Sequence, residues 1–384
     1  MKTYGIDKQC VLSVVIPCYQ EERTLRNSVE RLMTIQDPNL TLEVIIVDDG
    51  SKDASYTIAM ELAEQYAEVN VQQHQKNQGK GAALRTGFTM ATGDYVAIHD
   101  ADLEYDPNDL KKLLRPLLDD EADVVLGSRF LTADTHRVLY FWHSVGNKFL
   151  TLLSNMFTDL NLTDMETCYK VFRREVIQSV DIEESRFGFE PEIVAKIAHM
   201  RLRIFEMGIS YYGRTYEEGK KIGLKDAFRA FYCIFKFNAH RVPVPIQFLV
   251  YLFIGGTAAL INLSTVLGLV QLNVNINFSI IFAFMFAALI NYFLCVRLLF
   301  RRGARWSTTN EITLFVFVVV VVSGLDFGLT KLLLGQGLAL FFSKIIATAG
   351  SLIANFAGRR YLVFPEKPSG PWKSTWSPTA NPVK

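Results

Sequence analysis

The stretch "GDYVAIHDADLEYDP", from Gly93 to Pro107, runs an apolar segment directly into a group of carboxylates. The apolar run, Tyr95 to Ile98, has the length and composition of a buried strand. The acidic side chains that follow it are Asp100, Asp102, Glu104 and Asp106. Because like charges repel each other at short range, such a group requires a cation or several hydrogen-bond donors among its members.

Apolar runs of this kind alternate with helical patterns throughout the first half of the chain, which predicts a doubly wound α/β domain. The predicted strands are "VLSVVIP" (11–17), "LEVIIVDD" (42–49), "VNVQQH" (69–74), "YVAIHD" (95–100) and "ADVVLGS" (122–128). The predicted helices between them cover residues 22–34, 55–68 and 80–91. Ligands of such domains bind beyond the carboxyl ends of the strands, where this chain places carboxylates from separate strands.

The loops at these strand ends exclude two common designs for phosphate binding. No GxGxxG loop follows the first strand, and "NQGKGAA" around Lys80 lacks the spacing of a P-loop. A hard divalent cation explains the acidic group better. Asp100, Asp102 and Glu104 can present oxygens to Mg²⁺ or Mn²⁺, whose remaining ligands would be diphosphate oxygens and water. Asp49, one strand away, is suited to a base or a ribose hydroxyl.

The second half of the chain is mostly apolar, from Pro245 to about Leu362, although the formal net charge of all 384 residues is only +1. That charge gives no support for a nucleic-acid partner. Four apolar blocks, each long enough to cross a bilayer, predict an all-α membrane domain of four transmembrane helices. The blocks are Phe248–Leu269, Phe278–Val296, Ile312–Leu334 and Leu338–Leu362.

The distribution of basic residues predicts the orientation of these helices. The connection "RLLFRRGARW" and the segment "GRRYLVFPEK" after the fourth block are basic, whereas the other two connections are nearly neutral. The positive-inside rule therefore predicts an integral protein of the cell membrane with both termini and the α/β domain in the cytoplasm. The N-terminus lacks a signal-peptide pattern, and five scattered cysteines without metal spacing fit a reducing compartment.

Two further features concern the membrane. The segment "KKIGLKDAFRAFYCIFKFNAHRV" mixes basic and aromatic residues, which indicates a helix lying in the membrane interface, with a solvated surface helix as the alternative. Asp326 and Lys344 fall inside consecutive apolar blocks. They either form a structural ion pair or take part in moving a polar lipid headgroup.

Several ordered motifs resemble one family. "VVIPCYQEE", "VDDGSKD", "NQGKGAALRTG", "DADLEYDP", "GSRF" and "DMETCYKVFRR" look like an inverting family 2 glycosyltransferase of GT-A fold, a Rossmann-like mixed sheet. The most similar subgroup is the dolichol-phosphate mannose synthase-like enzymes, which glycosylate polyprenyl phosphates. The membrane part resembles a GtrA-type domain through its helix count and its "NYF" and "GRRYLVF" patches.

The resemblance implies a role for each matching position. Asp102 and Arg129 would be catalytic, and the metal ligands would be Asp100, Asp102 and Glu104. The donor would be bound by Pro17, Tyr19, Glu21, Val47, Asp49, Asp100, Ala101, Asp102, Arg214 and Lys220. The acceptor phosphate would be bound by Ser128, Arg129 and Arg137. For Asp164, Glu166, Glu190 and Glu192 the sequence leaves open whether they orient Arg129, meet sugar hydroxyls or serve structure.

The predicted reaction transfers a hexose, from GDP-mannose or UDP-glucose, to a dolichyl or undecaprenyl phosphate. The predicted boundaries are a catalytic domain at 1–215, interface helices at 216–246, the membrane domain at 247–364 and a disordered tail at 365–384. Three alternatives remain: a processive polysaccharide synthase, which should carry a QxxRW motif that is absent here, transfer to another lipid or protein acceptor, and a lipid-linked sugar flippase. The sequence leaves the oligomeric state open, a homo-oligomer included.

Overall fold

The computed structural model describes residues 6–131, 140–186, 188–213, 224–238, 244–299 and 308–364. It divides the chain into two compact units, with the division between Phe237 and Asn238. This division falls inside the segment 216–246 that the sequence predicts as a separate interface region.

The first unit is built on a seven-stranded sheet within the described part of the chain. Its strands are β1 (Cys10–Cys18), β2 (Leu40–Asp48), β3 (Val69–Gln73), β4 (Tyr95–Ile98), β5 (Val124–Ser128), β6 (Lys170–Arg173) and β7 (Ile204–Gly208). Its helices are α1 (Leu25–Met33), α2 (Ser55–Gln65), α3 (Lys80–Met90), α4 (Asn108–Leu118), α5 (Phe141–Thr158), α6 (Arg174–Ser179), α7 (Phe189–His199) and α8 (Leu224–Asn238).

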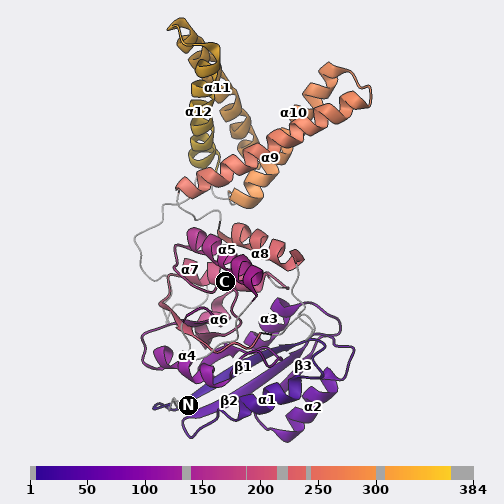
Figure 1. Ribbon diagram of the computed structural model, residues 1–384, viewed down its shortest axis with the longest axis vertical. Helices are drawn as coiled ribbons and strands as arrows, with labels where there is room; N and C mark the ends of the chain where they lie inside the picture. Colours follow the sequence, from indigo (N-terminus) through magenta and orange to yellow (C-terminus); the bar gives the residue numbers. More distant parts are fainter. Residues whose placement is uncertain are drawn as a thin grey trace. The chain divides into compact units, whose positions relative to one another are not determined.

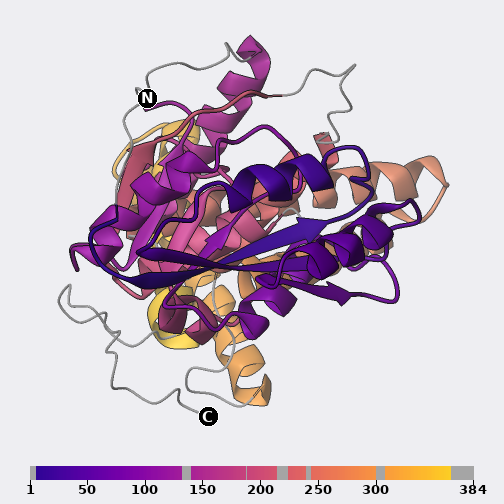
Figure 2. The same cartoon turned by 90° about the horizontal axis from the view of Figure 1, so that it is seen from below.

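The strand order is β3-β2-β1-β4-β6-β5-β7, and helices lie on both faces of the sheet (Figures 1 and 2). The prediction of a layered α/β domain is confirmed, and every strand expected from the sequence is present. The sheet is mixed, because β6 runs antiparallel to both of its neighbours, β4 and β5. The core consists of the central strands, whose Val, Ile and Leu side chains are almost fully buried.

The strand order reverses between β1 and β4. From β1 the chain moves outward to β2 and β3, and it then crosses back to β4 on the other side of β1. In an open α/β sheet the carboxyl ends of strands at such a reversal are a preferred place for ligands, because the connecting loops there diverge to opposite faces. The acidic stretch after β4 and the "CYQEE" stretch after β1 therefore emerge side by side.

The described part of the second unit contains two helical hairpins with the same design. The first consists of α9 (Val244–Gln271), α10 (Ile276–Leu294) and a short π-helical turn, η1 (Cys295–Leu299). The second consists of α11 (Thr308–Gly335), α12 (Leu340–Gly358) and η2 (Arg359–Val363). Each boundary of the second hairpin follows its counterpart by 64 residues, as from Val244 to Thr308 and from Cys295 to Arg359. The unit is thus an internal structural repeat.

One buried cation joins the two repeats. The guanidinium of Arg359 donates to Asn291 Oδ1 at 2.6 Å and to Asn355 Oδ1 at 3.2 Å, and these asparagines occupy equivalent positions of the two hairpins. It also lies 5.4 Å from the ring of Tyr251 and 4.4 Å from the ring of Phe315, a second equivalent pair. Arg359 therefore lies between the repeats and contacts both alike.

Charged side chains are unevenly divided between the repeats. Buried Glu311, which accepts a hydrogen bond from Tyr292 Oη at 2.7 Å, has Gln247 as its counterpart in the first hairpin. Asp326 in the second hairpin has Asn262 as its counterpart. The side chain of Lys344 lies outside the described residues, so its predicted pairing with Asp326 stays a prediction.

Two helices of this unit, Val244–Gln271 and Thr309–Gly335, are long and apolar enough to cross a membrane. The four apolar blocks of the sequence coincide with α9, α10, α11 and α12. The four-span prediction is therefore borne out only in part. How many of these helices cross the bilayer stays a prediction.

Candidate active site

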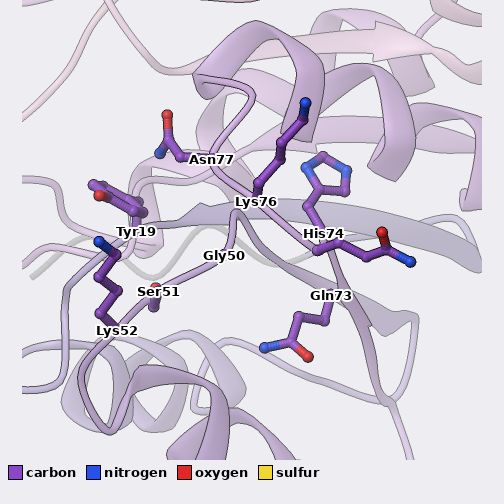
Figure 3. Close-up of a pocket in the computed structure, with 9 residues that line it drawn as sticks. Tyr19, Gly50, Ser51, Lys52, Gln73, His74, Lys76 and Asn77 are labelled. Atoms are coloured by element: carbon purple, nitrogen blue, oxygen red, sulfur yellow. The ribbon is translucent and has the colours of Figure 1, made fainter.

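A pocket of about 510 Å³ opens at the carboxyl ends of β1, β2 and β3. Tyr19 after β1 and Lys52 after β2 stand on one side of it, and Lys76 and Asn77 stand on the other (Figure 3). The lining residues are Tyr19, Gly50, Ser51, Lys52, Gln73, His74, Gln75, Lys76 and Asn77. An aromatic ring, two lysines and several amides suit a flat polar ring with attached anionic groups.

Asp49 is buried next to this pocket and forms hydrogen bonds to the segment that lines it. Its carboxylate accepts hydrogen bonds from His74 Nδ1 at 2.7 Å and from the backbone amides of Gln78 and Gly79 at 2.9 and 2.6 Å. Because Gly79 has a φ of +102°, this loop takes a path that a residue with a side chain would resist. Asp49 thus fixes the loop that carries Lys76 and Asn77.

The other residues predicted for the donor vary in their exposure. Tyr19 is partly exposed in the pocket, whereas Val47 and Ala101 are buried, Val47 within β2. Pro17 and Glu21 are half-buried. Glu21 accepts a hydrogen bond from Thr24 Oγ1 at 2.9 Å, so it shapes the turn between β1 and α1.

At the end of β4, Asp100 is paired with a buried lysine. Lys80 Nζ lies 2.9 Å from Asp100 Oδ1 and 3.2 Å from Glu190 Oε1, and only 17% of the Lys80 side chain is exposed. Burial alone would lower the pKa of Lys80, but the two carboxylates outweigh it and hold that pKa well above its usual value. The acidic stretch after β4 therefore has a cation among its members, the ammonium group of Lys80.

The backbone at the end of β4 is fixed by a buried imidazole. His99 shares hydrogen bonds with Ser28 Oγ at 2.9 Å and with Tyr169 Oη at 2.8 Å. Burial lowers the pKa of His99 to about 4, so the ring is neutral at physiological pH. Ser28 also donates to the carbonyl of Asp100 at 3.2 Å. These bonds set where the carboxylate of Asp100 emerges.

Asp102 and Glu104 continue the loop after β4. Asp102 is buried, and its Oδ1 accepts the backbone amide of Glu104 at 3.0 Å. Glu104 Oε2 accepts a hydrogen bond from Tyr211 Oη at 2.6 Å. Among the residues that the structure describes, no three acidic, histidine or cysteine side chains come close enough to hold a metal ion together. The metal set Asp100, Asp102 and Glu104 therefore stays a prediction.

Arg129, directly after β5, forms a buried ion pair. Its Nε and Nη2 donate to the two carboxylate oxygens of Asp164 at 2.7 and 2.8 Å, and Asn147 of α5 donates to the same carboxylate at 3.0 Å. Burial alone would raise the pKa of Asp164, but the charge and hydrogen bonds of Arg129 hold it below its usual value. Arg129 is thus a fixed, oriented cation.

Ser128, predicted to bind the acceptor, is fully buried and shapes the turn that presents Arg129. Its hydroxyl lies 2.6 Å from Thr163 Oγ1 and accepts the backbone amides of Phe130 and Leu131 at 3.1 and 3.2 Å. The side chain of Ser128 therefore stabilises the turn after β5, and its contact with an acceptor phosphate stays a prediction.

Comparison with known proteins gives this arrangement a family. Residues 13–181 match the model of glycosyl transferase family 2, and residues 250–364 match the model of the GtrA/DPMS transmembrane domain. The chain carries a family 2 glycosyltransferase domain followed by a GtrA/DPMS transmembrane domain. The site described above, from Tyr19 to Asp164, lies inside the family 2 domain.

Two relatives and one solved structure show the extent of the similarity. A dolichyl-phosphate beta-glucosyltransferase of Trichomonas vaginalis is 27% identical over 232 residues, which are 55% of this chain and 68% of the relative. A UDP-N-acetylglucosamine–dolichyl-phosphate N-acetylglucosaminyltransferase of Methanococcus voltae is 26% identical over 249 residues, 60% of this chain and 98% of the relative. A glucosyl-3-phosphoglycerate synthase structure from Mycobacterium tuberculosis, with Mn²⁺ and UDP, matches 61% of this chain and 81% of its own at 19% identity and a TM-score of 0.48.

Helix α5 of the family 2 domain presents an apolar stripe to its surroundings. Residues spaced by three or four positions lie on one face of a helix, and this spacing relates all six of the large exposed side chains of α5. The exposed apolar residues of α5 are Phe141, Trp142, Val145, Phe149, Leu152 and Met156. Trp142 is 80% exposed. The opposite face is packed, with Phe157 against Phe235 of α8. The same helix carries Asn147, which braces the Arg129–Asp164 pair.

Three predicted cations, Arg137, Arg214 and Lys220, lie outside the residues that the structure describes. Sequence reasoning missed Lys80 as a partner of Asp100, although its place between two glycines after β3 was a signal of a special loop. It also missed the face of α5, whose apolar spacing is visible in the sequence.

Proposed function

We propose that this chain transfers a hexose from a nucleotide sugar, GDP-mannose or UDP-glucose, to a polyprenyl phosphate and inverts the anomeric configuration. The product would be a β-linked lipid-phospho-sugar. The observation that carries the proposal is the buried guanidinium of Arg129, held at the same sheet edge as Asp100 and Asp102. In one chain with a transmembrane domain, an oriented cation opposite a carboxylate loop suits two phosphorylated substrates, one of them a lipid.

The donor would occupy the pocket at the ends of β1 to β3, with its diphosphate toward the loop after β4. Lys76 and Lys52 give that pocket positive charge, and Tyr19 offers a ring surface for the base. Lys80 already neutralises Asp100 in the structure. Its ammonium group would stay close to the diphosphate once the donor is bound. Arg214 and Lys220 are further candidates for the diphosphate, by resemblance.

The donor set after β4 fits a divalent metal. Mg²⁺ is commonly held by one or two protein carboxylates together with substrate phosphates, so a preformed cage of three protein ligands is not required. Asp100 and Asp102 would hold Mg²⁺ or Mn²⁺, with Glu104 as a third ligand if it leaves Tyr211. The ion pair between Asp100 and the ammonium of Lys80 supports a negatively charged carboxylate at this position. A bound metal would offset negative charge on the departing diphosphate.

The acceptor phosphate would bind at Arg129, with Arg137 as a second cation by resemblance. A lipid phosphate has its headgroup at the membrane surface and its chain in the bilayer. The exposed apolar stripe of α5, one hydrogen bond away from the Arg129–Asp164 pair through Asn147, suits a helix that lies against lipid. We infer that α5 faces the cytoplasmic membrane surface.

The reaction needs little proton transfer. A phosphate monoester has a second pKa near 6 and is mostly a dianion at neutral pH, so it is already a nucleophile. The obstacle is bringing this dianion to the anomeric carbon of a charged donor. Arg129, oriented by Asp164 before substrate arrives, reduces that repulsion and aligns the phosphate for in-line attack. Inversion follows from a single displacement.

The test is a transfer assay with the purified full chain in detergent. The acceptor is undecaprenyl or dolichyl phosphate with MnCl₂, and the labelled donor is GDP-mannose, UDP-glucose or UDP-N-acetylglucosamine. We expect label in the lipid phase with one donor, and at least a 100-fold lower rate for Asp102→Ala. Absence of transfer with every donor, although the nucleotide binds, would favour another acceptor or lipid transport.

A further inference from the structure

Strand β6 brings one segment of the chain between the two halves of the site. β6 lies between β4 and β5 in the sheet and runs antiparallel to both. The start of β6, at Lys170, is therefore at the same sheet edge as the end of β4, which leads to Asp100, and the end of β5, which leads to Arg129. The segment that enters β6, Asp164 to Tyr169, has to pass between these two positions.

This segment is rigid, because both of its ends and its centre are held. Asp164 is paired with Arg129. Lys170, fully buried, donates to the backbone carbonyls of Met165 and Thr167. These two carbonyls flank Glu166 on either side.

Two side chains of this segment, Glu166 and Thr167, have a buried oxygen without a hydrogen-bond partner among the described residues, and Glu166 is the ionisable one of the two. Its Oε1 is buried and has no hydrogen-bond partner among the described residues. The charged groups that act on it are Glu190 of α7, Lys170 of β6, and the pair Arg129 and Asp164. A buried carboxyl oxygen without a partner is costly, and Glu166 stands on the segment between the strand ends where the proposed function puts the two substrates, so a substrate group would satisfy it.

The protonation state follows from these surroundings. Burial, and after it the charge of Glu190, raise the pKa of Glu166 to about 8 against the opposing charges of Lys170 and Arg129. Glu166 is therefore mainly protonated at neutral pH. A neutral carboxyl group can donate one hydrogen bond and accept another, which a carboxylate cannot do.

We propose that Glu166 binds the donor sugar, with its carboxyl group donating a hydrogen bond to one hydroxyl of the hexose. This rests on the proposed function, since the sugar has to lie between the diphosphate at the β4 end and the acceptor phosphate at the β5 end. Glu166 stands on the segment between those ends. It thereby positions the hexose and contributes to the choice of sugar, while the phosphate acceptor needs no base.

The experiment compares Glu166→Gln, Glu166→Ala and the wild-type full chain in the lipid transfer assay. The donors are the nucleotide sugar that supports transfer by the wild type, UDP-glucose or GDP-mannose, and its 2-, 3-, 4- and 6-deoxy analogues. We expect one deoxy position to lower kcat/KM of the wild type about 10- to 100-fold and to have little effect in Glu166→Ala. Glu175→Gln, an exposed glutamate of α6, is the matched control and should behave as the wild type.

The pH profile distinguishes a hydrogen-bond donor from a base. Wild-type kcat/KM should be level between about pH 7 and pH 8 and fall above pH 8, as Glu166 loses its proton. Below about pH 6, protonation of the acceptor phosphate should lower the rate of every variant alike. Glu166→Gln, which keeps an N–H donor, should retain activity within a few fold and lose this alkaline limb. Activity that rises through pH 8, with an inactive Glu166→Gln, would overturn the proposal in favour of a base.

Two other results are also decisive. If Glu166→Ala lowers kcat/KM relative to the wild type by the same factor with every deoxy donor, and also weakens UDP or GDP binding, Glu166 has a purely structural role. If the wild type transfers no sugar at all, the proposed function fails. Calorimetry then compares the affinity of nucleotide sugar and free nucleotide, and the proposal requires that their difference shrink in Glu166→Ala and stay in Glu175→Gln.

Discussion

At the scale of single residues, the site is a set of buried charges that neutralise each other. Asp100 is paired with Lys80 and Asp164 with Arg129, so each of these two carboxylates has its own cation. This arrangement lets the loops after β4 and β5 stay close together before substrate binds. It also means that the loss of one partner exposes the other as an uncompensated buried charge.

Replacement of Asp164 by Asn should destabilise the family 2 domain by about 3–5 kcal/mol, because the buried guanidinium of Arg129 loses its counter-charge. The pKa of Asp164 is lowered from its usual 3.8 in the folded state. Its stabilising effect is therefore present above about pH 4 and is lost as the pH falls through the folded-state pKa. Thermal unfolding of both proteins should show a gap in Tm at pH 7 that narrows toward pH 3.

The control for this variant is Asp120→Asn, which alters a largely exposed partner of Arg173 and Arg203. It should leave Tm nearly unchanged, because solvent screens exposed ion pairs. A similar Tm for Asp164→Asn and the wild type at pH 7 would contradict the buried-pair argument.

At the scale of elements, α5 has two different faces. Its inner face packs on α8 and braces Arg129, and its outer face is a row of large apolar side chains. If the outer face lies in the membrane interface, Trp142 is close to acyl chains. In bilayers of brominated lipid, tryptophan fluorescence of the wild type should then be quenched more than that of Trp142→Phe. Equal quenching of the two proteins would place α5 away from lipid.

Arg359, which contacts both hairpins of the second unit, gives a prediction for the stability of that unit. Arg359→Gln removes the bond that joins Asn291 of one hairpin to Asn355 of the other, together with contacts to two rings. The free energy of unfolding of the membrane unit should fall by about 2 kcal/mol, the size expected for a few interhelical contacts in membranes. Unfolding in detergent should show it, with exposed Lys331→Gln as the control. No difference between the two variants would show that other contacts join the repeats.

Local pattern predicted the elements that repeat a simple rule and failed for those that depend on distant partners. The strands from "VLSVVIP" to "ADVVLGS" and the position of Asp100 beyond a strand follow from apolar runs and turns. The reversed direction of β6 does not, because the short strand "KVFR" pairs with residues 44 to 48 and 74 to 78 positions earlier in the chain. The pairing of Lys80 with Asp100 and of Arg129 with Asp164 likewise arises only when separate loops meet.

At the scale of the whole molecule, the number of helices that cross the bilayer decides on which side each connecting loop lies. Two crossings by α9 and α11 alone would place residues 272 and 336 on opposite sides. Four crossings would place both on the far side from the family 2 domain. Single cysteines at Leu272 and Gln336, labelled from outside intact cells, distinguish these cases. The five native cysteines are buried and should give little background.

We expect both introduced cysteines to react from the outside, which corresponds to four crossings and a cytoplasmic catalytic domain. Labelling of Leu272→Cys alone would indicate two crossings. Labelling of neither, in cells where permeabilisation exposes both, would reverse the predicted orientation.

The 64-residue repeat has a consequence for the history and the design of such chains. A hairpin of two membrane-crossing helices begins and ends on the same side of the bilayer. Duplication of such a hairpin therefore leaves every later segment on its original side. After copying, the two versions can diverge in chemistry while the backbone stays the same. Here one version keeps the amides Gln247 and Asn262, and the other carries the acids Glu311 and Asp326. The first hairpin is thus a template for replacing each of these two acids in the second hairpin by its isosteric amide.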